Sequence, residues 1–440
     1  MSYTKEDILR IAKEKELKFI RLQFTDIFGQ LKNVAITENM FEKVLSEGQT
    51  FDGSSIEGFV RIDESDMLLK PDYNSFTVLP WKEGVGRIIC DVYLSDKVTP
   101  FEGDPRHVLR NAINEAKEMG FSVNMGPECE FFLFDIDEKG NATTETDDVA
   151  SYFDIGAADK GEQCRSDICL ALQKMGYEIE ASHHECAVGQ HEIDFKFTEP
   201  LESADKVITF KHVVKTYARR HNLHATFMPK PVYGIAGSGM HTNISLMKDG
   251  KNAFYNPDDE YGLSETAYQF IAGMLYHVKA ITAVANPLVN SYKRLVPGYE
   301  APVYVSWSAS NRSALIRVPV ARGMATRVEL RSPDPSCNPY LEMAFCIAAG
   351  LDGVKKGMKA PKGIVKNIYA MTDDERKENG IENLPGNLSD AMDEYEKDPF
   401  TREVLGDHVY YKYLEGKRKE WESYRTKISR WELDEYLTKY

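Results

Sequence analysis

The 440-residue sequence lacks the features of membrane, exported and repetitive proteins. No apolar run approaches the ~20 residues that a membrane-spanning helix needs. The N-terminus is charged from Lys5 onward, so we expect no signal peptide. We find neither internal repeats nor low-complexity tracts, so the whole chain is expected to fold into ordinary domains.

Cysteine is sparse and unpaired in the sequence. The seven cysteines are scattered, and no two of them form a Cys-x-x-Cys motif. An odd number of cysteines in apolar surroundings is typical of reduced thiols in a protein core. We therefore expect a cytoplasmic protein.

Positive charge is also in short supply. The chain has 54 lysines and arginines against 69 aspartates and glutamates, a net charge of −15. Such a chain is a poor candidate for general nucleic-acid binding. An anionic substrate would need locally concentrated cations, and the arginines between residues 294 and 331 are the obvious source.

Acidic residues alternate with apolar ones in one short segment. Residues 126–132 read GPECEFF, and in a β-strand Glu128 and Glu130 would share one face while Cys129 and Phe131 share the other. Two adjacent carboxylates repel each other unless a cation lies between them. On this segment alone, a divalent-metal site and a solvated edge strand are about equally good interpretations.

Three further segments, residues 190–197, 240–246 and 327–331, show the same period-two alternation. Their polar faces carry glutamate, histidine and arginine instead of the serine, threonine and lysine of an ordinary surface. Carboxylates with an imidazole suit Mg²⁺ or Mn²⁺ better than structural zinc, which recruits thiolates. Arginines beside such a metal indicate phosphate chemistry. Together the segments predict antiparallel strands around an oxygen-rich metal site.

Local patterns predict the remaining elements. Thr4–Asp7 resembles a capping box that begins a helix, and residues 1 to about 100 form a small α+β unit. The Pro/Gly-rich segment 99–105 is a boundary, after which Asp104 is expected to cap a helix. Strands are expected at 19–25, 31–36 and 87–93, and loops at 51–55 and 135–149. Helices are expected at 105–119, 159–175, 201–221, 264–285 and from 398 onward.

Eight motifs along the whole chain resemble those of the glutamine synthetase family, in the same order and spacing. They are FDGSSI (51–56), GPECEFF (126–132), HHECAVGQHE (183–192), TFMPKP (226–231), GSGMHTNISL (237–246), NSYKRLVPGYEAP (290–302), NRSALIRVP (311–319) and RVELRSPDPSCNPYL (327–341). The set is highly specific, and it resembles the class I bacterial and archaeal type.

The resemblance implies an α+β fold with two domains. Residues 1–103 would form a β-grasp domain, and residues 104–440 a catalytic domain built on a curved antiparallel β-sheet flanked by helices. It also implies a homo-oligomer, a dodecamer of two hexameric rings with each active site between subunits.

The resemblance assigns ligands as well, while the pair His183–His184 is interpreted as structural. One Mg²⁺ or Mn²⁺ ion would be held by Glu130, Glu185 and Glu192, and a second by Glu128, His241 and Glu329. The co-substrate ATP would contact Glu180, Asn243, Ser245, Arg312, Arg317, Met324 and Thr326. Glutamate would contact Gly237, Arg294, Glu300, Arg312 and Arg331.

The reaction implied is the ATP-dependent condensation of L-glutamate with ammonia. Phosphorylation of the γ-carboxylate gives γ-glutamyl phosphate, whose leaving group is phosphate. Ammonium becomes nucleophilic only after losing a proton, and Asp52 of a neighbouring subunit would bind and deprotonate it. Tyr152 and Glu300 would complete the cation pocket. Glu300 lies on the flap 290–302, which would close as a lid against water.

Two features indicate the subtype without adenylylation, the I-alpha-like subtype. The stretch Ile381–Leu388, where a regulated relative carries an adenylylated tyrosine, has no tyrosine. Arg61 matches an arginine tied to feedback inhibition by glutamine in the related subtype. We expect direct product inhibition through Arg61, and a nitrogen-status regulatory protein is a candidate partner.

Two alternatives stay open. A glutamine-synthetase-like ligase for a larger amine would need an opened, less anionic pocket, and the presence of Asp52, Tyr152 and Glu300 argues against it. A catalytically silent regulatory scaffold would be marked by the loss of a metal ligand, and all six ligand positions are filled.

Overall fold

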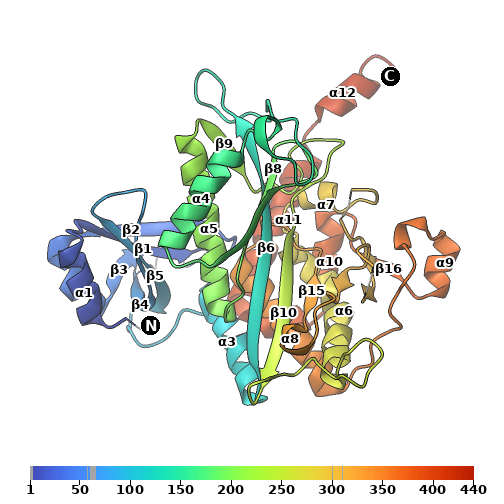
Figure 1. The fold of residues 1–440 in the computed structure, drawn as a ribbon, viewed down its shortest axis with the longest axis horizontal. Coiled ribbons are helices and arrows are strands. Elements are labelled where there is room, and N and C mark those ends of the chain that lie inside the picture. Colours follow the sequence, from blue (N-terminus) through green and yellow to red (C-terminus); the bar gives the residue numbers. More distant parts are fainter. Residues whose placement is uncertain (1–2, 57, 60–65, 300, 310) are drawn as a thin grey trace.

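Two large β-sheets, each with its own hydrophobic core, organise the chain. The structure, a computed structural model, describes residues 3–56, 58–59, 66–299, 301–309 and 311–440. Arg61 and Glu300 lie outside the described residues. The smaller, N-terminal sheet lies at one side of the molecule and the larger sheet runs through its centre (Figure 1).

The N-terminal sheet has the strand order β2-β1-β5-β4-β3, with β1 parallel to β5 and antiparallel to β2. The predicted capping box at Thr4 and Asp7 begins its first helix. Alternate residues of β1, Ile20, Leu22 and Phe24, are buried in the core. The elements are α1 (Lys5–Glu14), β1 (Phe19–Thr25), β2 (Leu31–Thr37), η1 (Glu38–Met40), α2 (Phe41–Glu47), β3 (Gln49–Asp52), β4 (Asp66–Val78) and β5 (Val85–Leu94). The strands predicted here are confirmed.

The loop predicted at residues 51–55 is partly wrong. Phe51 and Asp52 end strand β3 and pair with Met67 and Asp66 of β4. The loop begins only at Gly53. The pairing partner lies beyond the segment 57–65, so no local pattern identified the strand.

The central sheet has the main strand order β13-β14-β15-β10-β6-β8-β7, while β11 pairs with β10 and β9 with β6. Its strands are β6 (Ser122–Asp135), β7 (Ile179–His184), β8 (Gln190–Phe195), β9 (Leu223–Thr226), β10 (Met240–Lys248), β11 (Lys251–Asn252), β13 (Trp307–Ser308), β14 (Ile316–Arg317) and β15 (Val328–Leu330). The four segments predicted as polar-faced strands are the neighbours β15, β10, β6 and β8. The sheet is antiparallel as expected except for one pair, since β13 and β14 are parallel.

Helices surround this sheet, and α8 packs against both α3 and α6. Asp104 caps α3 as predicted, through the backbone N–H of Arg106. The helices are α3 (Pro105–Glu118), α4 (Glu162–Lys174), α5 (Pro200–Arg220), α6 (Glu265–Ala285), α7 (Ser291–Arg294), α8 (Pro339–Lys356), α9 (Asp373–Glu378), α10 (Leu388–Lys397), α11 (Phe400–Arg425) and α12 (Arg430–Tyr436). Short 3₁₀ turns are η3 (Gly156–Ala158), η4 (Gly323–Ala325) and η5 (Ile368–Ala370), and β12 (Tyr304–Val305) pairs with β16 (Glu382–Asn383).

The predicted helices are confirmed with small shifts in their bounds. The helix expected from residue 159 begins at Glu162, because η3 precedes it. The helical C-terminus contains a break at Gly406, whose φ of 72° is outside the helical region. Among the described helices, none is both long enough and apolar enough to span a membrane.

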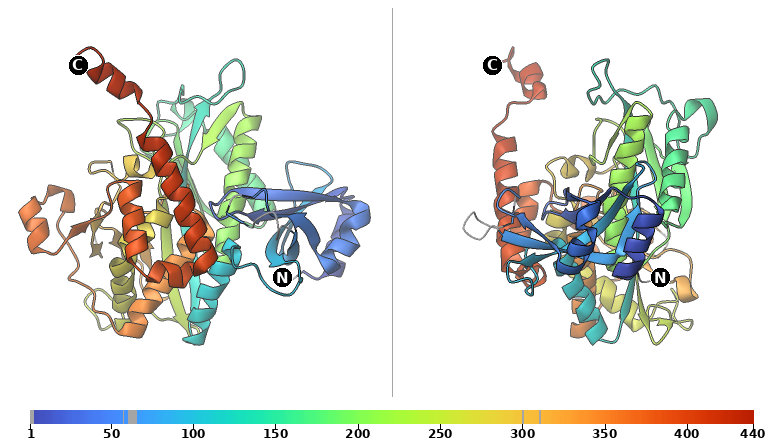
Figure 2. Two further views of the ribbon diagram at one scale, coloured as in Figure 1. Left: turned by 180° about the vertical axis from the view of Figure 1, so that it is seen from behind. Right: turned by 90° about the vertical axis from the view of Figure 1, so that its left-hand side faces the viewer.

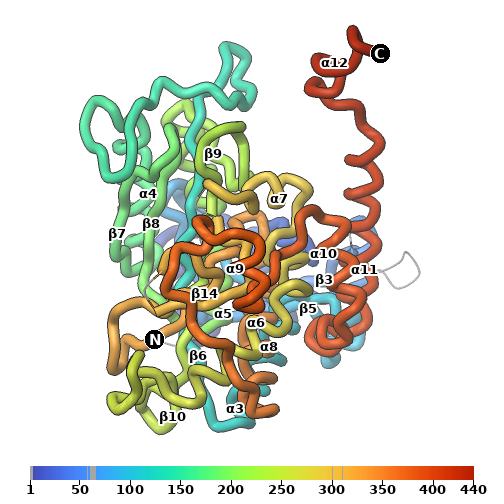
Figure 3. Tube along the Cα trace, turned by 90° about the vertical axis from the view of Figure 1, so that its right-hand side faces the viewer, coloured from blue at the N-terminus to red at the C-terminus, as the bar shows by residue number. Residues whose placement is uncertain are grey.

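The C-terminal helix α12 projects from the body of the molecule. It follows α11, which faces the viewer in the left view of Figure 2 and leads upward to α12 in Figure 3. Trp431 and Leu437 in this region are 62% and 73% exposed. Such apolar surface on a projecting helix is typical of a contact with another chain.

A buried arginine joins the N-terminal sheet to the helices of the central sheet. The guanidinium of Arg106 is 2% exposed, and it donates to Asp72 and Asp91 of β4 and β5 and to Asp205 of α5. Asp205 also accepts from the hydroxyl of Tyr340 at 2.7 Å. Since buried charges are costly unless they are paired, this group fixes the position of one sheet relative to the other.

We expect Arg106→Met to lower the free energy of unfolding by about 3–5 kcal/mol, because the buried Asp205 loses its ion-pair partner and Asp72 and Asp91 keep only the partly exposed Arg110. Urea unfolding followed by circular dichroism measures the change. The matched control is Arg10→Met, since Arg10 forms two exposed ion pairs and should change stability by under about 1 kcal/mol. Equal effects of the two substitutions would contradict the assignment of Arg106 as the joint.

Candidate functional site

Strand register gathers the predicted metal ligands on one face of the central sheet. His241 of β10 lies opposite Glu128 of β6, and Glu192 of β8 lies opposite Glu130 of β6. On the other side of β10, Glu329 of β15 lies opposite Asn243. Residues directly opposite each other in antiparallel strands have neighbouring side chains. The prediction that Cys129 and Phe131 share the opposite face of the strand is confirmed, because both are fully buried.

One cluster consists of Glu128, His241 and Glu329. The Nδ1 atom of His241 lies 3.6 Å from a carboxylate oxygen of Glu128 and 3.7 Å from one of Glu329. Burial opposes the charge of Glu128, but hydrogen bonds from His241 and Asn243 prevail and lower its pKa. Three potential ligand atoms thus lie within 4.8 Å of one another.

Two arginines flank the buried carboxylate of Glu329, which is 1% exposed. Arg317 Nη2 lies 2.5 Å from Oε2, and Arg331 Nε lies 3.2 Å from Oε1. Paired guanidinium groups offset the cost of burying the charge. The same arginines bring positive charge to the edge of the first cluster.

A second cluster consists of His183, Glu185 and Glu192. His183 lies 3.5 Å from Glu185 through Nδ1 and 3.3 Å from Glu192 through Nε2. His183 therefore lies beside two carboxylates of the proposed metal site. From the sequence alone, it is interpreted only as one half of a structural histidine pair. Burial and the neighbouring charge of Glu130 hold the pKa of Glu192 well above its usual range.

Glu130 lies between the two clusters. Its Oε2 accepts hydrogen bonds from Gln190 Nε2 and from the backbone N–H of Gly239, each at 2.9 Å. Burial and the charge of Glu185 raise its pKa, although His241 acts in the opposite direction. Carboxylates that crowd in this way are stabilised by a cation, and their oxygens with imidazole nitrogens are the donors that Mg²⁺ and Mn²⁺ accept. The donor set fits the expected divalent ions.

A cavity of about 350 Å³ opens next to the first cluster. It is lined by five of the residues expected to contact ATP: Glu180, Asn243, Ser245, Met324 and Thr326. The sequence prediction missed Asp194, Phe197 and Arg327 in the same lining. Asp194 is two residues from Glu192 on one strand, so strict period-two counting would have found it. The guanidinium of Arg327 donates to Asn243 Oδ1 at 2.9 Å and so orients a predicted ATP contact.

The residues expected to hold glutamate are partly brought together. Arg294 is buried and donates to the carbonyl oxygens of Ser332 at 2.7 Å and Arg331 at 3.3 Å. Gly237 lies against it, since a Cβ there would be 3.2 Å from Arg294 Cγ. Arg331 donates to the carbonyl of Arg312, whose own side chain is exposed.

Tyr152 and Asp52 differ in their distance from this face. The ring of Tyr152 stacks on Phe153 at 4.0 Å and meets His183 edge-on at 5.7 Å, which places it beside the second cluster. Asp52 ends a strand of the N-terminal sheet, which lies to one side of β6, β8 and β10 in Figure 1. Its carboxylate is exposed, and hydrogen bonds from Ser54 lower its pKa.

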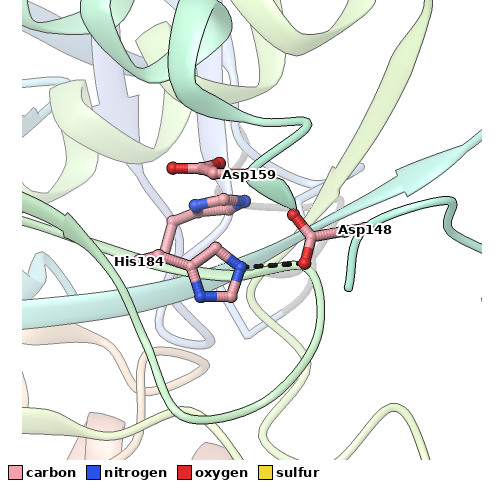
Figure 4. A group of neighbouring side chains, drawn as sticks. Asp148, Asp159 and His184 are labelled. Atoms are coloured by element: carbon pink, nitrogen blue, oxygen red, sulfur yellow. Dashed lines mark hydrogen bonds and ion pairs between the residues drawn. The ribbon is translucent and has the colours of Figure 1, made fainter. Parts of the chain in front are cut away.

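A third cluster of buried polar groups lies behind the second. It contains Asp148, Asp159, His184 and His191, all buried, and sequence spacing gave no sign of it. Figure 4 shows Asp148, Asp159 and His184, with the hydrogen bond between Asp148 and His184 dashed. Burial opposes the charges of Asp148 and His184, but their mutual hydrogen bond lowers the pKa of Asp148 to about 2 and raises the pKa of His184.

Comparison with known proteins assigns the fold and the family. Residues 16–95 match the family profile "Glutamine synthetase, beta-Grasp domain", and residues 102–436 match "Glutamine synthetase, catalytic domain". The chain belongs to the glutamine synthetase family. The fold is accordingly α+β, and the activity is that of a glutamate–ammonia ligase, an enzyme of glutamine biosynthesis.

Named relatives agree over their whole length. A glutamine synthetase of Clostridium saccharobutylicum is 61% identical and one of Thermus thermophilus 57%, with 100% of this chain and 99% and 100% of the relatives covered. A solved structure of a GmaS/ADP complex is 34% identical with a TM-score of 0.90, and each chain is covered completely. A Plasmodium falciparum glutamine synthetase is 26% identical, with a TM-score of 0.86 and 99% of each chain covered. The membership of the glutamine synthetase family expected from the eight motifs is confirmed.

Proposed function

We propose that this glutamine synthetase-family chain joins L-glutamate to ammonia through γ-glutamyl phosphate at the face formed by β15, β10, β6 and β8. The observation that carries the proposal is that five of the six expected ligands form two clusters, with Glu130 opposite Glu192 and a cavity of about 350 Å³ next to the first cluster. A silent scaffold would have no reason to bury so many repelling carboxylates at one place.

The proposed metal ligands are those of the two clusters. Glu128, His241 and Glu329 would hold one Mg²⁺ or Mn²⁺ ion, and Glu130, Glu185 and Glu192 the other, with His183 next to the latter. When bound, the ions supply positive charge that stabilises the transferring phosphoryl group. The donor geometry and the raised pKa of Glu130 and Glu192 support this assignment.

ATP is proposed to occupy the cavity next to the first cluster. Glu180, Asn243, Ser245, Met324 and Thr326 line it, and the related GmaS structure is that of an ADP complex. Arg317, paired with Glu329, would face the phosphoryl group together with Arg312. Their charges would then face the negative charge that develops during phosphoryl transfer, an arrangement that favours this reaction.

Glutamate is proposed to lie against Arg294 and Gly237, with Arg331 and Arg312 at its other end and Glu300 closing over it. The backbone bonds that hold Arg294 rigid support this position, because a fixed guanidinium orients a carboxylate. Asp52 would take the proton from ammonium, and Tyr152 and Glu300 would complete the cation pocket. A small anionic pocket favours ammonium over a larger amine.

The proposed reaction needs more than one chain. Asp52 lies in the N-terminal sheet, whose position is fixed by the buried Arg106 pairs, away from the clusters of its own chain. The exposed apolar residues of α12 also favour association. We propose a dodecamer of two hexameric rings, with 1–103 of one subunit completing the site in 104–440 of the next.

The cellular setting and regulation are proposed from the same resemblance. The buried thiols of Cys90, Cys129, Cys164, Cys337 and Cys346 support a reducing cytoplasm. Residues 381–388 without tyrosine support the non-adenylylated I-alpha-like subtype, with glutamine as a direct inhibitor through Arg61 and a nitrogen-status regulatory protein as partner.

The test of this function is phosphate release from ATP with Mg²⁺ and glutamate, with and without ammonium, with glutamine measured in parallel. We expect release that requires ammonium and equals the glutamine formed. Activity only with a bulkier amine would assign the chain to the sibling ligases. No release with any amine, in the presence of Mg²⁺ or Mn²⁺, would favour the scaffold.

We expect Asp52→Asn to lower ammonium-dependent turnover by about 100-fold or more, because the amide cannot accept the proton. Binding of ATP and glutamate should be unchanged. The matched control is Asp96→Asn, since Asp96 is exposed in the same part of the chain and accepts a backbone N–H two residues ahead, as Asp52 does. Steady-state kinetics compare the two variants, and near-normal turnover of Asp52→Asn would refute the role.

We expect Arg61→Ala to relieve inhibition by glutamine, with at least a several-fold rise in the inhibitory concentration and unchanged turnover without glutamine. This expectation comes from the resemblance, because Arg61 lies outside the described residues. The measurement is initial rate against glutamine concentration, with Arg10→Ala as the control. Identical inhibition curves for Arg61→Ala and the wild type would rule it out.

A further inference from the structure

The third cluster has the composition of a metal site but already contains a cation. Potential ligand atoms of Asp148, Asp159, His184 and His191 lie within 4.8 Å of one another. The guanidinium of Arg165 enters this group, with Nη1 2.8 Å from both Asp159 Oδ2 and His191 Nδ1. Arginine does not give up its proton in proteins, so Nδ1 of His191 must accept. The fixed positive charge of Arg165 would repel a metal ion bound there. We therefore interpret the cluster as a structural support.

His184 makes two hydrogen bonds in the cluster. Its Nδ1 bonds the carbonyl oxygen of Glu185 at 2.6 Å, and its Nε2 bonds Asp148 Oδ1 at 3.0 Å. A carbonyl can only accept, so Nδ1 donates, and the carboxylate accepts from Nε2. The hydrogen bond from His184 and the ion pair with Arg165 thus hold Asp148 and Asp159 in place.

Asp148 connects three segments of backbone. Its two carboxylate oxygens accept from the N–H groups of Ala150, Lys160 and Gly189, at 3.1, 3.1 and 3.2 Å, besides the bond from His184. Ala150 and Lys160 lie near the two ends of the loop 148–161, and Gly189 lies in the turn between β7 and β8. One buried side chain therefore closes the loop and attaches it to the hairpin.

The loop and the hairpin carry different parts of the proposed site. Tyr152 belongs to the loop, and Phe153 next to it donates its N–H to the carbonyl of His184 at 3.1 Å. Glu185 and Glu192 belong to the hairpin and directly follow His184 and His191 in the sequence. The ring of Tyr152 meets His183 across the junction.

Arg165 supports the hairpin from α4. Besides Asp159 and His191, it donates through Nε to the hydroxyl of Ser182 on β7 at 3.1 Å. It thereby touches both strands of the hairpin from behind, on the side away from Glu185 and Glu192. Its planar fork of donors makes all three contacts at once, which lysine cannot reproduce.

We propose that Asp148, His184 and Arg165 are positioning residues, which fix Tyr152 of the loop 148–161 relative to Glu185 and Glu192 of the hairpin. The proposal rests on the proposed function of those three residues. Because Asp148, His184 and Arg165 join the loop to the hairpin, ammonium recognition and metal binding both depend on these three buried residues. Losing it should weaken both together while leaving the first cluster, Glu128, His241 and Glu329, intact.

The decisive variant is Asp148→Asn. An amide has one acceptor oxygen in place of two, so it cannot accept from all four donors that Asp148 serves. Loss of a group that orients metal ligands from outside typically weakens metal binding about 10–100-fold. We expect that loss for one class of bound Mn²⁺ and a KM for ammonium raised at least several-fold, with the KM for ATP within about twofold of wild type.

The matched control is Asp398→Asn. His277 is buried and bonds Asp398 at 2.6 Å and Asp352 at 3.0 Å, so the substitution disrupts the same kind of histidine–aspartate contact among helices elsewhere in the chain. It should lower thermal stability to a similar degree but leave Mn²⁺ affinity and both KM values unchanged. A merely structural role of Asp148 would make the two variants alike.

The experiment titrates full-length wild-type protein, Asp148→Asn and Asp398→Asn with Mn²⁺ alone, followed by electron paramagnetic resonance. Glu185→Gln identifies the class of bound Mn²⁺ that belongs to the hairpin. Selective weakening of that class in Asp148→Asn supports the proposal. Wild-type affinity in both classes, or equal weakening of both, overturns it.

A second variant tests the proposal if Asp148→Asn does not fold. This variant is Arg165→Lys, which keeps the positive charge but loses the contacts to Ser182 and His191. The same selective loss is then expected, and unchanged Mn²⁺ binding contradicts the proposal.

The Mn²⁺ titration does not depend on turnover. A wild-type chain that makes no glutamine would therefore refute the proposed function, while the Mn²⁺ titration would still test the positioning role.

Discussion

Repulsion among buried carboxylates is the constraint on which the rest of the structure depends. Glu130, Glu192 and Glu329 are all buried, and charge in such a place is unfavourable unless it is compensated. The chain compensates Glu329 with Arg317 and Arg331, and Glu130 with an amide and a backbone N–H. Glu130 and Glu192 both keep a raised pKa, so their compensation is incomplete in the protein alone. That residual cost is what a divalent cation would remove.

The antiparallel sheet is what makes this crowding possible. Its period of two residues sends every second side chain of β6 into the site and the others into a core that includes Cys129 and Phe131. If the register of β6 shifted by one residue, Glu128 and Glu130 would face that core and the ring of Phe131 would face the site. The hydrophobic face therefore secures the register, and the register secures the alignment of Glu128 with His241 and of Glu130 with Glu192.

Sequence reasoning succeeded where a pattern is local and failed where partners are distant. The strand at GPECEFF and the cap at Asp104 follow from neighbouring residues, and the structure has both. The parallel pair β13–β14 consists of two-residue strands, which are too short to show any period. Asp148 and Arg165 reach the hairpin from separate segments, and loop residues are ordinarily assigned to the surface. The position of His183 beside Glu185 and Glu192 was not predicted, because adjacent histidines show no spacing that distinguishes a ligand from a packed ring.

The joint between the two sheets bears on how a complete site can form. The Arg106 pairs are buried, and the guanidinium of Arg87 in the N-terminal sheet bonds Thr209 of α5 at 3.1 Å. Separating these groups would leave several charges buried without partners, at a cost of several kcal/mol. A swing of the N-terminal sheet that carries Asp52 to the clusters of its own chain is therefore disfavoured. If Asp52 is the base, its partner site belongs to a second copy, and assembly becomes a condition for proton removal from ammonium. In that case, the same stiffness that stabilises the single chain makes catalysis depend on its association with a second chain.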